Sequence, residues 1–172
     1  MRDLIARHEG VEVLDGRADA LPVPDGCADA AWLGSVVHHL PDLAAAAREL
    51  RRALKPGAPV LIRNTFPGRC QDDIRVRYFP ETARGIDGYP SVEHVSAVFA
   101  AAGFPTATVT SLPQQNAPTL AAYGQTLRRE SDSKLRALTD EEYHRGLAKL
   151  HADAAARPQA PAISWMDLLV LR

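Results

Sequence analysis

Two adjacent histidines follow an apolar run and are the side chains of this sequence best suited to chemistry. His38 and His39 come shortly after Gly34 and Ser35, in the stretch "GSVVHHLPD". An imidazole has a reference pKa of about 6.5, so it can act as a general base near neutral pH. Glycine and other small residues let the backbone approach a bound molecule closely. We therefore expect a small-molecule site here, with His38 and His39 as candidate catalytic residues and a capping or packing role as the alternative.

The remaining histidines and the two cysteines lack the spacing of a metal site. Cys27 and Cys70 stand far apart and form no C-x-x-C pair. His94, His144 and His151 fall in stretches with helical patterns and do not form an H-E-x-x-H motif. We therefore expect no metal ligands among these residues.

Composition and charge restrict the class of protein. The chain has 172 residues, of which 46% are hydrophobic and 24% charged, and its net charge is −1. This length and composition predict one soluble globular domain over residues 1–172. The near-neutral charge argues against nucleic acid or an anionic membrane as a partner. No apolar run approaches the roughly 20 residues of a membrane span, and nothing near Met1 resembles a signal peptide. We expect a cytoplasmic protein.

Strand and helix patterns alternate along the chain. Apolar or alternating runs predict strands at 11–16, 28–37, 58–66, 106–112 and 162–171. Helical spacing predicts helices at 1–8, 42–54, 91–102 and 119–157, the last with breaks at 131–133 and 139. The alternation is typical of an α/β fold with a mostly parallel sheet covered on both faces.

Other local patterns add detail to this outline. Residues 67–90 are interrupted by glycine and proline and read as irregular. Thr139 and Glu142 form a capping box at the start of a helix. Trp32 and Trp165 lie in expected strands, so we expect both side chains in the core.

The order of several short motifs resembles that of class I S-adenosylmethionine-dependent methyltransferases. Residues 16–29 read "GRADALPVPDGCAD", an expected strand ends before "HHL", and "ELRRALKPG" precedes the next apolar strand. The nearest branch acts on small molecules and includes the ubiquinone/menaquinone C-methyltransferases. The resemblance implies a Rossmann-like sheet with an antiparallel last strand, and enzymatic methyl transfer from S-adenosylmethionine to an unidentified small molecule.

The resemblance also implies which residues hold the cofactor. Arg17 and Ala18 would border the adenine, with Asp19 beside them. The family often has an acidic or amide residue in place of Arg17, so a backbone role is implied there, and Asp19 has a solvated loop carboxylate as its alternative reading. Gly34 and Ser35 would line the methionine side.

On the substrate side, the resemblance implies two further features. His38 and His39 would sit at the mouth of the pocket, near the substrate. The helical insert at about 119–157 would cover this side as a lid.

The glycine loop that normally carries such a cofactor is missing. No two glycines of the sequence are separated by a single residue, so there is no G-x-G. The absence also disfavours a dehydrogenase-type nucleotide site. Relative to the family, the sequence begins after the second strand, which implies a partial, N-terminally truncated domain without the first two strands.

Three expectations follow from that comparison. In the family strand order 3-2-1-4-5-7-6 the missing strands lie in the middle of the sheet, so the strand within residues 28–37 would have an exposed edge. We expect self-association through this edge or marginal stability, and weak binding of the cofactor. The alternative function is that of a catalytically inactive methyltransferase remnant serving as a binding or regulatory partner.

Overall fold

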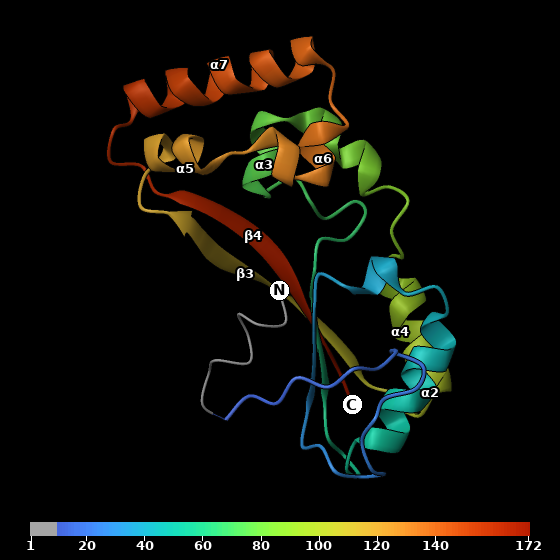
Figure 1. Cartoon of the computed structure of the whole chain (residues 1–172). Helices are drawn as coiled ribbons and strands as arrows, with labels where there is room; N and C mark the ends of the chain where they lie inside the picture. Colours follow the sequence, from blue (N-terminus) through green and yellow to red (C-terminus); the bar gives the residue numbers. More distant parts are fainter. Residues whose placement is uncertain (1–9) are drawn as a thin grey trace.

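A computed structural model describes residues 10–172 of the chain. It consists of a four-stranded sheet flanked by helices, with a group of further helices beyond one end of the sheet (Figure 1). The strands are β1 (Ala31–Gly34), β2 (Val60–Asn64), β3 (Ala107–Ala117) and β4 (Ala162–Leu171). The α-helices are α2 (Leu43–Ala53), α3 (Ile74–Tyr78), α4 (Val92–Ala101), α5 (Leu120–Thr126), α6 (Ser133–Arg136) and α7 (Asp140–Ala156). Short 3-10 helices are η1 (Val37–His39), η2 (Pro80–Gly85) and η3 (Arg129–Ser131).

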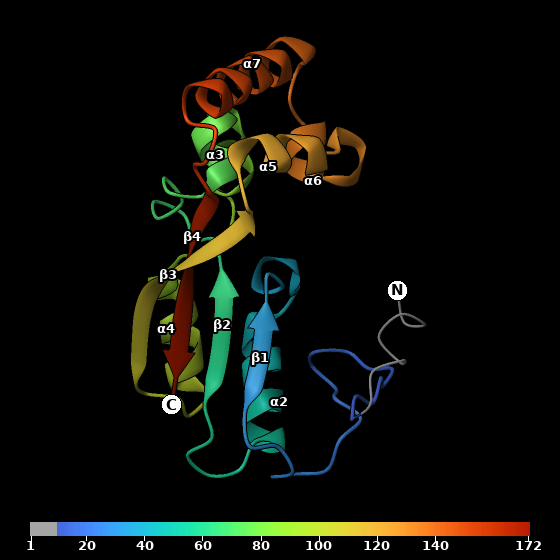
Figure 2. The same ribbon diagram turned by 90° about the vertical axis from the view of Figure 1, so that its left-hand side faces the viewer.

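The strands run in the order β1-β2-β4-β3, which Figure 2 shows nearly face-on. This order corresponds to the 4-5-7-6 half of the arrangement implied by the resemblance, and the α/β, Rossmann-like expectation is confirmed. β1 and β2 are parallel, whereas β4 is antiparallel to both β2 and β3. The antiparallel last strand is therefore confirmed. The expectation of a mostly parallel sheet is wrong for the described strands, because β4 lies between β2 and β3 and makes both of its pairings antiparallel.

The expected strand at 11–16 does not form. These residues join no strand, and the only pairing nearby is an isolated bridge between Arg17 and Ala20. In the part of the chain that the structure describes, β1 pairs with β2 alone, so no strand lies beside 11–16 to accept its backbone hydrogen bonds. Val11, Val13 and Leu14 are correspondingly exposed. The helix expected at 1–8 lies outside the described residues.

Three other boundaries differ from those expected. β1 is shorter than the run at 28–37, because Ser35 has a φ of 55° and ends the extended conformation. β3 continues to Ala117, since its second half pairs with the long β4. Residues 67–90 contain α3 and η2, although their glycine and proline residues predicted irregular structure.

The long helices agree with their sequence signals. The Asp42 carboxylate accepts the Ala45 N–H at the start of α2, and the Ser91 hydroxyl accepts the His94 N–H at the start of α4. The capping box of Thr139 and Glu142 is confirmed at the start of α7. β4 has the bounds 162–171 that the sequence predicts. None of the helices in residues 10–172 has the length and hydropathy needed to cross a membrane.

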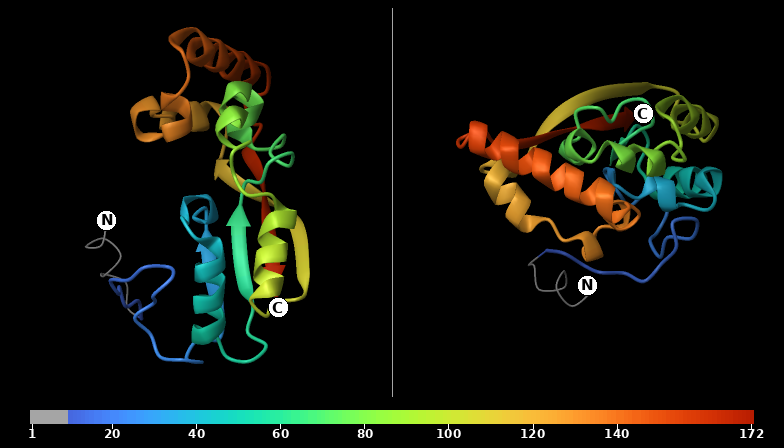
Figure 3. Two further views of the ribbon diagram at one scale, coloured as in Figure 1. Left: turned by 90° about the vertical axis from the view of Figure 1, so that its right-hand side faces the viewer. Right: turned by 90° about the horizontal axis from the view of Figure 1, so that it is seen from above.

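The core has two parts. The first lies between the sheet and the helices α2 and α4, which cover one sheet face (Figures 1 and 3). Its fully buried side chains include Val60, Ile62, Phe99 and Phe104. The second lies among α3, α5, α6 and α7, at the end of the sheet where β1 and β2 terminate.

The two tryptophans are not core residues. Trp32 is 60% exposed and Trp165 is 44% exposed, so the expectation for both is wrong. Trp32 points away from its buried neighbour Leu33, to the sheet face opposite α2 and α4, and no described helix covers that face. Trp165 lies in the part of β4 that extends beyond its pairing with β2.

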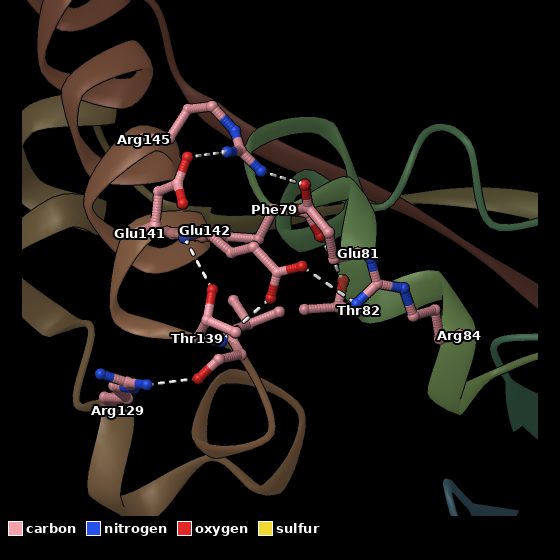
Figure 4. Close-up of polar contacts among 10 residues, drawn as sticks. Phe79, Glu81, Thr82, Arg84, Arg129, Thr139, Glu141, Glu142 and Arg145 are labelled. Carbon is pink, nitrogen blue, oxygen red and sulfur yellow. Dashed lines mark hydrogen bonds and ion pairs between the residues drawn. The ribbon is translucent and has the colours of Figure 1, made fainter.

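The helices between β3 and β4 form an insert, as the pattern at 119–157 predicts. α7 is attached to η2 by ion pairs of Arg145 with Glu81 and of Arg84 with Glu142, the latter with an N–O distance of 3.0 Å (Figure 4). Within the insert, Arg129 of η3 pairs with Asp140 of α7. The two ion pairs between α7 and η2 hold the insert against the segment that leads to Tyr89.

Candidate functional site

The backbone turns sharply where β1 ends. Ser35 is the only non-glycine residue with a positive φ in the described part of the chain. Its N–H donates to the Arg63 carbonyl at 2.8 Å, which fixes the turn against the carboxyl end of β2. A positive φ is uncommon for serine and is frequently retained at functional sites. The turn delivers η1, with both histidines, to the edge where ligands bind in open α/β sheets.

His38 is held by three neighbours. Its ring stacks on Tyr89, with 3.8 Å between centroids and 11° between planes, and lies 4.0 Å from the ring of His39. Its Nδ1 is 3.3 Å from Oδ1 of Asn64, a buried residue. The Asn64 amide donates to the Thr65 carbonyl at 2.9 Å, so its Oδ1 is oriented to accept.

These contacts define the protonation state of His38. Because Asn64 accepts, Nδ1 carries the proton and Nε2 has a free lone pair. Burial, and then the neighbouring His39, lower the pKa of His38 from its usual value. The imidazole is therefore neutral at neutral pH, which is the form that can accept a proton.

His38 and His39 border a cavity of about 330 Å³. The cavity lies between the carboxyl ends of β1 and β2 and the helical insert, and we call it the histidine cavity. The residues on which the argument below depends are Ser35, His38, Arg63, Asn64, Tyr89 and Lys134. It thus combines a neutral base with cationic and amide groups.

A second hollow, of about 240 Å³, lies on the other side of η1. It is lined by Arg17, Ala18, Asp19, Leu40, Pro41 and Asp42, and we call it the Ala18 hollow. Arg17 and Asp19 form a paired salt bridge with N–O distances of 2.8 and 2.7 Å. This hydrogen bond lowers the pKa of Asp19, so its carboxylate stays charged.

The chain around the Ala18 hollow is fastened to α2. The Arg52 guanidinium donates to the carbonyls of Leu21 and Val23, at 3.1 and 2.9 Å, and pairs with Glu49. Glu49 in turn accepts the N–H of Leu21 at 2.8 Å. A loop without strand partners is thereby held in one position beside α2.

The structure brings together most of the site residues expected from the sequence. Arg17, Ala18 and Asp19 meet in the Ala18 hollow, and Ser35 joins His38 and His39 at the histidine cavity. Gly34 lines neither of these; a side chain there would come within 3.0 Å of the Trp32 indole nitrogen.

Sequence reasoning missed several polar residues of the histidine cavity, among them Asn64, Arg63, Tyr89 and Lys134. Asn64 and Arg63 interrupt the otherwise apolar β2, and this break near a strand end was a usable signal. Tyr89 lies in the segment that read as irregular. Lys134 lies in the insert, where no pattern distinguishes a ligand-facing lysine from a solvated one.

The sequence profile of a family described as "Methyltransferase domain" matches residues 2–62. This stretch contains the Ala18 hollow, β1, η1 and both histidines. Residues 2–62 are therefore similar to this methyltransferase family, in line with the resemblance to the class I S-adenosylmethionine-dependent methyltransferases. S-adenosylmethionine is the methyl donor of that family. A comparison with curated proteins gives no match.

Solved structures share the fold. A protein of Anabaena variabilis, described as a methyltransferase from an antibiotic biosynthesis pathway, is 17% identical with a TM-score of 0.61, over 96% of this chain and 74% of its own. A methyltransferase of Thermotoga maritima, described as a possible histamine N-methyltransferase, is 17% identical with a TM-score of 0.53, over 98% of this chain and 67% of its own. At these identities the likeness establishes the methyltransferase fold and not the substrate.

The residues present fit one part of the cofactor. The Ala18 hollow offers apolar surface from Ala18, Leu40 and Pro41, and the Asp19 carboxylate can accept from an exocyclic amine. These are the groups that a flat heterocycle such as adenine requires. Beyond this hollow lies the open edge of β1, where the described residues form no opposing wall.

Proposed function

We propose that this protein transfers a methyl group from S-adenosylmethionine to a small molecule, with the adenine in the Ala18 hollow and the acceptor in the histidine cavity. The observation that carries the proposal is the position of η1. Leu40 and Pro41 at its end line the Ala18 hollow, while His38 and His39 line the histidine cavity. Donor and acceptor would therefore meet across one short turn.

The chain's own residues then have distinct roles. The bound donor supplies an electrophilic methyl group on a sulfonium. Methyl transfer depends mainly on alignment of the acceptor, which the walls of the histidine cavity would provide. Nε2 of His38 accepts the proton that the acceptor loses, and Asn64 keeps that nitrogen unprotonated. The insert at 119–157 would cover the acceptor and limit access of water.

Binding of the product S-adenosylhomocysteine tests the donor site. Ala18→Arg fills the Ala18 hollow and should abolish binding, whereas Ala101→Arg, on the exposed end of α4, should not.

Transfer of labelled methyl from S-adenosylmethionine to a panel of small molecules tests the acceptor site. His38→Gln should remove most of the transfer and His144→Gln should leave it. Donor binding without transfer to any compound would favour the inactive remnant.

We further propose that copies of the chain associate through β1. The N–H groups of Ala31 and Ser35 donate to the carbonyls of Pro59, just before β2, and of Arg63. By alternation the N–H groups of Trp32 and Gly34 point to the open edge. An unpaired edge beside an exposed tryptophan favours pairing with another chain. Light scattering should show Trp32→Lys to be more monomeric than the wild type. A wild-type monomer at all concentrations would contradict this proposal.

Weak donor binding and a cytoplasmic location complete the proposal. The described residues supply one wall of the donor site, so we expect a monomer of these 172 residues to bind S-adenosylhomocysteine with a Kd well above the micromolar range. Micromolar binding by a monomer would contradict that expectation.

A further inference from the structure

The carboxylates of the histidine cavity already have partners. Asp73 accepts the N–H groups of Arg75 and Val76, at 2.8 and 3.4 Å, where α3 begins. Asp132 accepts the Lys134 N–H at 2.9 Å at the start of α6, and its other oxygen is 3.0 Å from Nε of Arg75. Arg75 is thus paired with Asp132 and Asp73 caps α3, and neither carboxylate forms an ion pair with Arg63 or Lys134.

Lys134 extends a half-buried ammonium group along this cavity. Its Nζ is 5.4 Å from the centre of the Tyr89 ring, and it forms no salt bridge within residues 10–172. Burial, and then the nearby Arg75, lower the pKa of Lys134, and Asp73 and Asp132 offset part of that effect. A partly desolvated cation that forms no direct ion pair costs free energy, which an anion in the cavity would recover.

Arg63 is the second cation without a carboxylate. Its guanidinium donates to the side-chain oxygen of Gln114 and lies 3.0 Å from the sulfur of Met166. Both partners are neutral, and the ion pairs of the described chain do not include Arg63. A guanidinium can bind a carboxylate or phosphate through two parallel hydrogen bonds.

We propose that the histidine cavity selects an acidic small molecule, whose carboxylate or phosphate group binds Arg63 and Lys134. The inference rests on the proposed function, since it names the class of acceptor for the same site. A volume of about 330 Å³ accommodates a metabolite-sized molecule. Because His38 lines the same cavity, an acid held by the two cations keeps the rest of the molecule beside the base.

Simple anions can test the site without a known substrate. Isothermal titration calorimetry at constant ionic strength would compare the dissociation constants of benzoate and inorganic phosphate with that of neutral benzamide. We expect benzoate, phosphate or both to bind, and benzamide to bind at least tenfold more weakly. Phosphate binding alone would identify a phosphorylated acceptor, and benzoate binding alone a carboxylic acid. Equal binding of benzoate and benzamide would overturn the inference, and this comparison requires no variant.

Substitutions then locate the anion. Lys134→Gln and Arg63→Gln should each weaken anion binding about tenfold, the loss of one charge-assisted hydrogen bond. Lys134→Arg should retain binding. Arg48→Gln, an exposed arginine of α2 outside the cavity, is the matched control and should behave as the wild type. Unchanged anion binding in both Lys134→Gln and Arg63→Gln, with circular dichroism spectra like the wild type, would overturn the assignment.

Binding of S-adenosylhomocysteine separates this inference from the function on which it rests. One outcome is that S-adenosylhomocysteine binds the wild type and not the Ala18→Arg variant, while neither anion binds the wild type. In that case the inference fails and the methyltransferase proposal stands. If the anions bind at Arg63 and Lys134 but S-adenosylhomocysteine does not bind, the anion site stands and the methyltransferase proposal fails.

Discussion

Replacing Gly146 with alanine tests how the insert is held on the rest of the molecule. Gly146 is a buried residue of α7, at its contact with α3 and the residue that follows it. A Cβ built there would lie 2.2 Å from Cδ1 of Phe79, 2.4 Å from its Cε1 and 2.7 Å from the Tyr78 carbonyl oxygen. Phe79 is fully buried and the carbonyl belongs to the backbone, so neither atom can move aside without displacing its neighbours.

The expected effect combines two opposing terms. Alanine gains about 0.5–1 kcal/mol over glycine in the middle of a helix. Overpacking a filled core typically costs about 1–3 kcal/mol and occasionally more. Contacts below 3 Å on three atoms place this site at the upper end of that range. We therefore expect Gly146→Ala to lower the free energy of unfolding by roughly 2–2.5 kcal/mol net.

Gly124 provides the matched control. It lies in α5, and its nearest atom to an added Cβ is Cδ2 of Leu150 at 3.5 Å, an ordinary contact. Gly124→Ala should therefore raise the free energy of unfolding by about 0.5 kcal/mol or more through helix propensity alone. Urea unfolding followed by far-UV circular dichroism measures both variants. If Gly146→Ala is as stable as Gly124→Ala, the described packing of α7 on Phe79 is wrong.

Two further outcomes follow from individual side chains. An NMR pH titration measures His38, whose signal is assigned by its loss in His38→Gln. Its pKa should lie below 6.5, because burial disfavours the charged ring. Its neutral form should be the Nδ1–H tautomer, because Asn64 accepts from Nδ1. The basic form should therefore persist as pH falls to about 6.5 and be lost below it, and a pKa above that value would contradict the site geometry. Arg69→Ala should reduce the free energy of unfolding by about 1–3 kcal/mol. The buried Asp167 carboxylate would keep its hydrogen bond from the Ser111 hydroxyl but lose its ion pair with the Arg69 guanidinium, 2.6 Å away. Arg48→Ala should change it by less than about 0.5 kcal/mol, and a similar small loss in Arg69→Ala would show that water replaces the ion pair.

Local signals in the sequence were sufficient for elements whose stability is local. The capping box of Thr139 and Glu142 and the caps Asp42 and Ser91 act within one turn, so their residues identify the helix starts directly. β4 is apolar at most of its positions, and its run in the sequence has the same bounds as the strand.

Elements that depend on distant partners were not predictable in the same way. The pattern at 11–16 has the alternation of a strand, but alternation cannot supply the neighbour that a strand needs. Residues 74–85 become helical on packing against the insert, as the buried side chains of Tyr78 and Phe79 show. The exposure of Trp32 reflects which sheet face is covered, and this is a property of the whole fold.

The candidate site shows the same division. Arg17, Ala18, Asp19, Ser35, His38 and His39 lie in a short stretch whose motifs follow a family pattern, and the structure gathers them around η1. Arg63, Tyr89 and Lys134 reach the histidine cavity from β2, from the loop before α4 and from α6. Because that meeting requires the insert to fold back over the sheet, only the structure reveals it.

Equilibrium dialysis with labelled S-adenosylhomocysteine is the most direct test of the central claim, that the donor lies in the Ala18 hollow. It should be run at high protein concentration on the wild type, Ala18→Arg and Ala101→Arg. The account predicts measurable binding by the wild type and by Ala101→Arg, and none by Ala18→Arg. No binding by the wild type, or equal binding by Ala18→Arg, would contradict it.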